Sequence, residues 1–188
     1  MRLSKEESAR RRRQIVEVAA KLFREHGYNG IGVADLMKGA GLTHGGFYGY
    51  FESKEQLLAE ACEQAIETSV QQWQSWIRRN PGDPVRELAH SYLNEAHRDT
   101  LAAGCVISSL GADAVREGQD VRRALTGGIS AQLRLLAKAL PGPASRARKR
   151  AIATYAAIIG GLMLARAVDD RRLSNEILAA TAAQLNND

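Results

Sequence analysis

The amino-terminal part of the chain shows the clearest spacing of apolar and polar positions. Apolar side chains recur at intervals of three and four residues from Ile15 to Phe23, which places them on one face of a helix. This pattern predicts an amphipathic helix over residues 5–26. Gly27 follows, and a glycine at this place commonly ends a helix. Residues 28–31 are then expected to form a connector.

A second pattern, over residues 33–51, predicts two short helices joined by a tight turn. Apolar residues at i, i+3 and i+4 from Val33 give the first of these helices one apolar face. Gly39 and Gly41 permit the chain to turn sharply after it. Gly32 stands where this first helix would be capped.

The second short helix is expected to begin at Thr43, whose hydroxyl would accept from the amides of the first turn. Phe47 and Phe51, four residues apart, would anchor it to the core. The residues left facing outward are His44, Gly45, Tyr48 and Gly49. Two helices joined by a glycine turn form the helix-turn-helix pattern, in which the second helix enters the DNA major groove. Helix-glycine-helix segments also occur in helical domains that never meet DNA, so the pattern needs support from its surroundings.

The distribution of charge supplies that support. The chain carries a net charge of +5, and residues 1–54 hold 10 Lys and Arg against 6 Asp and Glu. The remaining residues are nearly neutral. A basic excess around a helix-turn-helix favours a polyanionic partner over a merely solvated basic surface.

The rest of the chain also predicts helices. Ser53 followed by Gln56 is a capping box that opens a long helix over 54–78. Proline-glycine segments at 81–84 and 141–143 interrupt the remainder. Further helices are expected over 85–101, 105–116, 119–140, 144–168 and 174–185, with the glycine pair 127–128 as a weak point or kink. No alternating run indicates a strand, so the predicted fold is all-α, with about nine helices.

Several classes of protein are disfavoured. Two cysteines imply no disulfide framework, and we find neither a membrane-length apolar run nor a secretory signal, so a soluble cytoplasmic protein is expected. A phosphate-binding loop and a nucleophile elbow are both missing, so we predict no enzyme and no cofactor. Glu87 and His90, with His97, could form part of a metal-binding bundle, but the ligand set is incomplete and no metal is expected.

Residues 22–28, 33–51 and 52–58 together resemble the TetR family of bacterial transcriptional regulators, because several separate motifs occur in the right order and spacing. The resemblance covers roughly residues 10–60. It implies a three-helix DNA-binding domain over 1–53, with the helix-turn-helix at 33–51. Residues 54–188 would then form a helical ligand-binding and dimerisation domain.

The resemblance also assigns roles within the predicted head. Thr43 and His44 would meet the groove, Gly45 would permit close backbone approach, and Tyr48 and Lys54 would bind phosphates. The full set of expected DNA-binding residues is Gly32, Val33, Thr43, His44, Gly45, Phe47, Tyr48, Tyr50 and Lys54. Gly46 and Gly49 depart from the family, which often carries Thr or Ser and His there. Base readout would therefore depend more on His44 and on the preceding helix.

The segment 144–168 is apolar almost all round, so it must be covered on nearly every side. It is either a central core helix or, as the resemblance implies, half of a four-helix dimer bundle formed with the last helix. The expected dimer interface comprises Tyr155, Ala156, Ile159, Gly160, Met163, Ile177, Leu178 and Thr181.

The C-terminal part also contains candidates for small-molecule recognition. Trp73, Trp76, Ile77 and Tyr92 could line a pocket for an apolar effector, or could be ordinary core. Cys105 follows a glycine at an expected helix start, where free amides favour a thiolate. It is either a sensor of oxidants and electrophiles or a packing residue.

Taken together, the sequence predicts a homodimeric, ligand-responsive repressor that binds a palindromic operator in double-stranded DNA and is released by a small apolar or electrophilic effector. The alternatives are an activator or a regulator without a ligand, a redox- or electrophile-sensing repressor acting through Cys105, and a helical metal-binding protein using Glu87, His90 and His97.

Overall fold

The computed structural model describes residues 4–187, so the first three residues and Asp188 lie outside the described part of the expected domains 1–53 and 54–188. Over residues 4–187 the chain forms nine α-helices and two short 3₁₀ helices, with no strand, which confirms the all-α prediction. The elements are α1 (Lys5–His26), α2 (Val33–Gly39), η1 (His44–Gly49), α3 (Lys54–Arg79), α4 (Pro84–Tyr92), α5 (Glu95–Asp99), α6 (Val106–Leu110), η2 (Asp113–Val115), α7 (Gln119–Ala139), α8 (Ala144–Ala167) and α9 (Arg171–Asn187).

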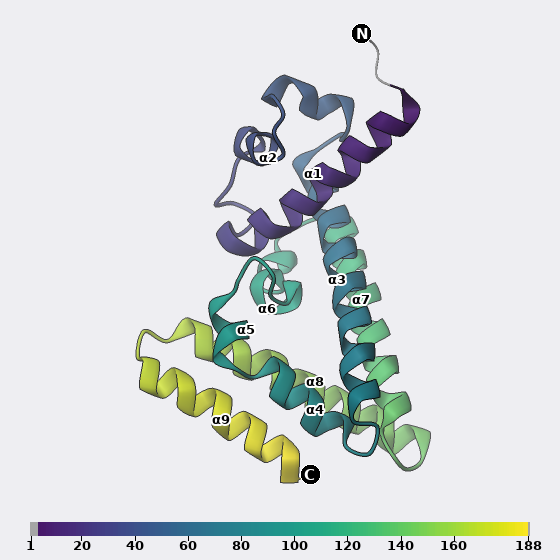
Figure 1. Ribbon diagram of the computed structural model, residues 1–188, viewed down its shortest axis with the longest axis vertical. Helices are drawn as coiled ribbons and strands as arrows, with labels where there is room; N and C mark the ends of the chain where they lie inside the picture. Colours follow the sequence, from purple (N-terminus) through teal and green to yellow (C-terminus); the bar gives the residue numbers. More distant parts are fainter. Residues whose placement is uncertain (1–3, 188) are drawn as a thin grey trace.

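The molecule is elongated, with a small head at one end (Figure 1). The head is built from α1, α2 and η1, and the tail from the helices that follow. Helix α3 leaves the head and runs down the tail beside α7, while α8 and α9 lie at the far end with α4 (Figure 1). The short helices α5 and α6 lie between the two ends, below α1. A single hydrophobic cluster continues from the head into the tail.

Helix α1 has the predicted bounds, and its ends have local causes. The Ser4 hydroxyl accepts a hydrogen bond from the amide of Glu7 at 3.1 Å and caps the first turn. Gly27 ends the helix with a φ of 73°, a value that side chains disfavour. The apolar stripe is buried, and Ile15, Ala19 and Phe23 are fully inaccessible to solvent.

The second helix of the helix-turn-helix is a 3₁₀ helix of six residues rather than an α-helix. Backbone bonds of the i to i+3 type define it, such as Tyr50 N to Phe47 O at 2.9 Å. Three of its six residues are glycine, which has low helix propensity, so this segment gains little from α-helical geometry. The expected cap is wrong in one respect: Thr43 stands at the cap position, but its hydroxyl makes no capping bond.

Helix α3 connects the head to the tail. The Ser53 hydroxyl accepts from the Gln56 amide at 3.0 Å, and the Gln56 side chain accepts from the Glu52 amide at 2.7 Å. This arrangement is a capping box shifted by one residue, and it fixes the start of the helix directly after the head. Its 26 residues span about 39 Å at 1.5 Å per residue, so α3 contacts both ends of the molecule.

The middle of the chain departs from the prediction. The helix expected over 85–101 is divided into α4 and α5, because Asn94 caps α5 by accepting from the His97 amide at 2.9 Å. The helix expected over 105–116 is likewise divided into α6 and η2. Residues 100–105, hereafter the 100–105 loop, connect α5 to α6.

The pair Gly127–Gly128 does not interrupt α7, which continues through both residues. A Cβ atom on Gly128 would lie 2.2 Å from Cγ2 of Ile66, so this glycine permits close approach of α7 to α3. Close packing therefore explains a residue that the sequence suggested as a kink.

Helix α8 is long and apolar enough to cross a membrane by length and composition, which corrects the expectation that no such segment exists. In this structure it is instead part of the tail, where it packs against α7 and α9 and buries Ile158 and Leu162 completely.

Candidate nucleic-acid interface and internal cavity

The outward face of η1 carries most of the side chains expected to meet DNA. Thr43, His44 and Gly45 are exposed, and the side chain of Tyr48 is 71% exposed. Phe47 is fully buried and packs against the ring of Phe51 at a centroid distance of 5.7 Å. Our assignment of Phe47 as a DNA-binding residue is therefore wrong, because its side chain anchors η1 from below.

The remaining expected DNA-binding residues differ in their exposure. Gly32 is exposed at the start of α2, whereas Val33 and Tyr50 are half-buried and pack against the core. The ammonium of Lys54 donates to the Tyr28 carbonyl and lies 4.2 Å from the centroid of the Tyr28 ring. Burial lowers its pKa. In this structure Lys54 is bound within the protein, so binding a phosphate requires its release from Tyr28.

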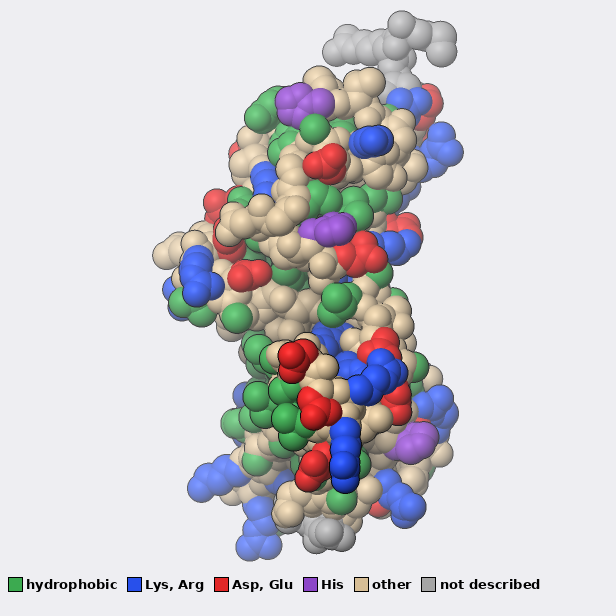
Figure 2. All heavy atoms as spheres, turned by 90° about the vertical axis from the view of Figure 1, so that its left-hand side faces the viewer, with side chains coloured by type: hydrophobic (Ala, Val, Ile, Leu, Met, Phe, Trp, Pro, Cys, Tyr) green, Lys and Arg blue, Asp and Glu red, His purple; other side chains and the backbone are tan. Residues whose placement is uncertain are grey.

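Charges on one face of the molecule are mixed rather than segregated. On the face shown in Figure 2, Lys and Arg side chains alternate with Asp and Glu over both ends of the molecule, and no continuous basic patch covers the head. The basic excess of the head is partly neutralised internally, since both guanidinium nitrogens Nη1 and Nη2 of Arg12 bind the Glu60 carboxylate. This ion pair also joins α1 to α3.

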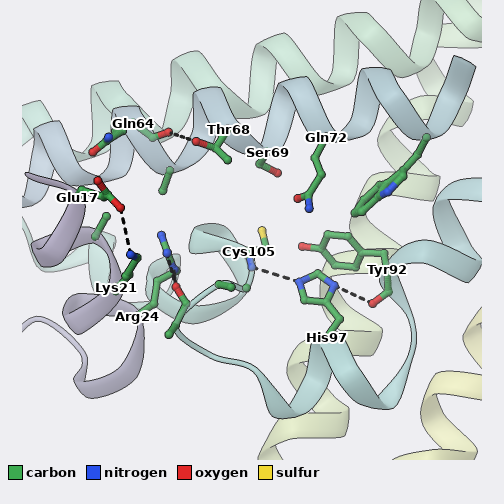
Figure 3. Close-up of a pocket in the computed structure, with 16 residues that line it drawn as sticks. Glu17, Lys21, Arg24, Gln64, Thr68, Ser69, Gln72, Tyr92, His97 and Cys105 are labelled. Atoms are coloured by element: carbon green, nitrogen blue, oxygen red, sulfur yellow. Dashed lines mark hydrogen bonds and ion pairs between the residues drawn. The ribbon is translucent and has the colours of Figure 1, made fainter.

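A cavity of about 420 Å³ lies below the head, between α1, α3, α4 and the 100–105 loop (Figure 3). Trp76, Tyr92 and Cys105 line it, as do polar residues that the sequence did not suggest. Trp73 and Ile77 do not line this cavity: Trp73 is fully buried beside Tyr92 and Tyr155, and Ile77 packs against the core. The full lining is Glu17, Ala20, Lys21, Arg24, Gln64, Ala65, Thr68, Ser69, Gln72, Trp76, Tyr92, His97, Ala102, Ala103, Gly104 and Cys105.

The polar residues of the cavity are arranged on two sides. Gln64, Thr68 and Gln72 come from α3 on one side, and Arg24 and Cys105 lie on the other (Figure 3). Arg24 belongs to α1 of the head, and its Nε donates to the Ala102 carbonyl at 2.7 Å, with Nη2 donating to the same oxygen. Burial lowers the pKa of this guanidinium.

His97 holds the wall of the cavity together. Its Nδ1 lies 2.9 Å from the Tyr92 carbonyl, and its Nε2 accepts from the Cys105 amide at 3.3 Å. Both contacts are satisfied by the neutral ring with its hydrogen on Nδ1. Burial, with a smaller contribution from the positive charge of Arg166, lowers the pKa of His97 to about 4.

Cys105 stands at the N-cap position of a helix of only five residues without making a side-chain capping bond, and the residue is 5% exposed. Its thiol lies in the cavity wall near the Tyr92 hydroxyl (Figure 3). Any reagent that reaches this thiol must therefore enter the cavity. Whether Cys105 senses such a reagent stays a prediction.

The expected dimer interface is partly wrong. Ala156 and Met163 are exposed on α8 and Gly160 is half-exposed, but Tyr155, Ile159 and Leu178 are buried within the single chain. The Tyr155 hydroxyl even donates to Gln132 at 2.8 Å in the interior. On α9, Ile177 is half-buried, and Thr181 packs so closely that a Cβ on Gly161 would lie 2.9 Å from it. The exposed large apolar residues of α8 are Ile152, Met163 and Leu164.

The three candidate metal ligands do not form a site. Glu87 accepts from Arg79 at 2.7 Å on the surface, whereas His97 lies in the cavity wall. Within residues 4–187, no group of three or more His, Cys, Asp or Glu side chains is arranged to hold a metal ion.

Arg24 and the polar face of α3 were not predicted from the sequence. One signal was present: Gln64, Thr68 and Gln72 are spaced by four and so lie on one helix face. No sequence signal connects Arg24 to residue 102, because the two are 78 positions apart.

The exposed η1, the glycine turn before it and the helical tail together define a helix-turn-helix transcriptional regulator. A family model described as bacterial regulatory proteins of the tetR family matches residues 15–61. This match covers most of the head and the start of α3, and it supports a relationship of that part of the chain to the tetR family.

Individual relatives agree with this assignment. The repressor NemR of Escherichia coli is 26% identical over 132 residues, which cover 69% of this chain and 66% of NemR. The crystal structure of its reduced form has a TM-score of 0.79, with 23% identity over 95% of this chain and 97% of that one. A TetR-family regulator from Cytophaga hutchinsonii has a TM-score of 0.80 at 21% identity, over 100% and 98% of the two chains.

A third structure, AibR in complex with isovaleryl coenzyme A and operator DNA, has a TM-score of 0.64 at 18% identity, over 93% of this chain and 97% of that one. These structural likenesses concern the fold.

Proposed function

We propose that this chain is a transcriptional repressor that binds a palindromic operator as a homodimer and leaves it when a small molecule enters the cavity. The observation that carries the proposal is the pairing of a buried Phe47 with an exposed Tyr48. The first fixes η1 to the head, and the second stands free to reach a groove or a phosphate. The name of NemR as a repressor, and the operator DNA bound to AibR, support this function by analogy. A protein of this kind acts in the cytoplasm, and it is not an enzyme.

The proposed dimer forms through the exposed face of α8, together with α9. This face combines large apolar residues with the small residues Ala156 and Gly160, which permit close helix approach. Two heads held by such a dimer would read half-sites about 34–36 Å apart, or somewhat more.

The proposed release works through α3. This helix starts directly behind η1 and forms one side of the cavity (Figures 1 and 3). A ligand that favours a different tilt of α3 changes the separation of the two heads. A tenfold loss of operator affinity requires about 1.4 kcal/mol of difference in ligand affinity between the two states.

Gel shift on the duplex upstream of the chain's own gene tests DNA binding. We expect His44→Ala and Tyr48→Ala each to weaken binding by about tenfold, since a specific contact contributes about 1–3 kcal/mol. Val115→Ala is the matched control, because Val115 is 78% exposed and lies on the tail. Equal binding by all three variants would refute the proposed reading face. Reporter output in a deletion strain separates a repressor from an activator by its sign.

A second candidate function is sensing of electrophiles through Cys105, which is favoured by the position of its thiol in the cavity wall. The reaction is alkylation, in which the sulfur displaces the leaving group of a reagent such as iodoacetamide and the thiol proton passes to solvent. Cys62 is the internal control, because it is 1% exposed and burial raises its pKa to about 12.

Mass spectrometry after brief treatment should therefore find modification at Cys105 before Cys62, with loss of operator binding in parallel. If the reagent releases the Cys105→Ser variant from the operator as readily as it releases the natural chain, this second function is excluded.

A further inference from the structure

The cavity below the head is more polar than a pocket for an apolar effector. Seven of its lining side chains carry an amide, a hydroxyl, a thiol or an imidazole, and three more are charged. Two of the buried polar atoms, the Tyr92 hydroxyl and Oε1 of Gln64, have no hydrogen-bond partner within the described part of the chain. A buried polar atom without a partner is costly, so these two atoms mark places where a ligand or ordered water completes the site.

The Tyr92 hydroxyl is the stronger of these two markers. Tyr92 is 1% exposed, and its hydroxyl points into the cavity toward Cys105 (Figure 3). A phenol with no partner has a hydrogen to donate, so it suits an acceptor on the ligand.

The charges around the cavity favour an anion. Lys21 at the mouth is already paired with Glu17 at 3.1 Å. Arg24 has no carboxylate within ion-pair distance among residues 4–187, and both of its hydrogen bonds go to the single carbonyl of Ala102 through Nε and Nη2. Nη1 is left for another acceptor, and a guanidinium binds carboxylates in a planar, charge-assisted geometry.

We propose that the cavity binds a small organic carboxylic acid, with its carboxylate on Arg24, its apolar body beside Trp76 and a hydrogen-bond acceptor on Tyr92. This inference rests on the proposed function, because it names the chemical class of the effector. It also replaces the apolar effector expected from the sequence.

The position of Arg24 gives the ligand a direct connection to the head. Arg24 is part of α1, and Ala102 is part of the 100–105 loop of the tail, so the bonds between them join the two ends of the molecule. A carboxylate is a stronger acceptor for a guanidinium than a neutral carbonyl is. Binding of the acid therefore draws Arg24 from Ala102 and loosens the contact of α1 with the tail.

The first test measures binding without DNA, on the full chain. 4-Hydroxybenzoate, 3-(4-methoxyphenyl)propionate and 8-hydroxyoctanoate each carry an acceptor oxygen besides the carboxylate. Each is compared with the corresponding neutral amide by thermal shift and by tryptophan fluorescence, to which Trp76 in the cavity lining contributes. At least one acid should bind about tenfold more tightly than its amide, since a charge-assisted bond is lost in the amide. If every amide binds as well as its acid, or if no acid binds at millimolar concentration, the inference is overturned.

Variants then locate the selectivity. Arg24→Gln should abolish the preference for the acid, Arg24→Lys should retain part of it, and Tyr92→Phe should weaken the acid that binds best. Arg78→Gln, which removes an exposed arginine at the far end of α3, is the matched control for loss of one charge. An acid preference that survives Arg24→Gln would contradict the proposed site, provided that the variant melts cooperatively.

The last measurement separates this inference from the proposed function. Gel shift of the unliganded chain on its upstream duplex tests the repressor, and addition of the selected acid tests release. Acid selectivity without any duplex binding would refute the repressor and leave the acid site standing. Duplex binding without acid selectivity would refute the acid site and leave the proposed repressor standing.

Discussion

Two buried tyrosines beside Trp73 differ in one respect, which makes them a matched pair for testing the cavity. The ring centroids of Tyr92 and Tyr155 lie 6.1 and 5.5 Å from that of Trp73, and both side chains are buried. The Tyr155 hydroxyl donates to Gln132 Oε1 at 2.8 Å, whereas the Tyr92 hydroxyl has no hydrogen-bond partner in residues 4–187. Replacing each by phenylalanine removes one oxygen atom and little else.

The expected changes in the free energy of unfolding have opposite signs. Tyr155→Phe leaves Oε1 of Gln132, a residue only 1% exposed, without its donor, and an orphaned buried acceptor costs about 1–3 kcal/mol. Tyr92→Phe removes a hydroxyl that already has no partner, so we expect no loss and a gain of up to about 1 kcal/mol. For a chain of this size, each kcal/mol corresponds to about 2–4 °C in Tm.

Urea denaturation followed by circular dichroism measures both changes, at one protein concentration because a dimer's stability depends on it. The measurement is made without ligand. If Tyr92→Phe destabilises the chain as much as Tyr155→Phe does, the Tyr92 hydroxyl is bonded in the folded protein. That result would also remove a main argument for the acid site.

Three further predictions concern other parts of the molecule. The pKa of His97 is about 4 in the folded chain and 6.5 in the unfolded one, so between these pH values only the unfolded state takes up the proton. The free energy of unfolding should therefore fall as the pH is lowered from about 6.5 to about 4. His97→Gln should reduce this pH dependence in urea titrations. Phe47→Ala should cost about 3–5 kcal/mol of stability and abolish duplex binding, whereas Tyr48→Ala should lower only duplex binding, as paired melting and gel-shift curves would show. Leu164→Glu should yield monomers in analytical ultracentrifugation, and Val115→Glu, a similar change on the tail away from α8, should not.

Much of the fold could be predicted because its causes are local. The bounds of α1 and α3 follow from an apolar stripe and from caps within four residues, so the sequence contains all the information needed. The division between α4 and α5 depends on Asn94, whose side chain both accepts from His97 and donates to the His90 carbonyl. An asparagine side chain can form such hydrogen bonds in many contexts, so the spacing of residues alone does not predict that Asn94 starts a new helix.

The candidate sites were predictable to different degrees. The exposed face of η1 lies within one short segment, and the spacing of Phe47 and Phe51 correctly predicted that Phe47 anchors this segment to the core, so its inclusion among the DNA-binding residues was wrong. On α8 the error has another cause: a helix that is apolar all round gives no indication of which face is outward, so Tyr155 and Ile159 were placed on the wrong side. The cavity depends on contacts between α1 and residue 102, and such contacts leave no periodic signal.

The head, the cavity and helix α8 of the proposed dimer face come together near the 100–105 loop. Arg24 reaches it from the head, and Arg166 reaches its neighbourhood from α8, donating to the carbonyls of His97 and Arg98 at 2.8 and 3.1 Å. A Cβ on Gly104 would lie 2.7 Å from Nη2 of Arg166 and 3.0 Å from the Thr100 carbonyl oxygen, so a larger residue there would have to displace the Arg166 side chain.

Four buried or half-buried arginines differ in the charge of the groups that they bind. Arg12 binds the carboxylate of Glu60, and Arg98 binds that of Asp99, so these contacts are charge-assisted on both sides. Within residues 4–187, Arg24 and Arg166 bind only neutral oxygens, which hold a guanidinium less strongly. An anion entering the cavity can therefore compete for Arg24 while the Arg12–Glu60 pair keeps α1 and α3 moving together. The difference in acceptor strength, rather than distance alone, is what would allow a ligand to change the position of the head.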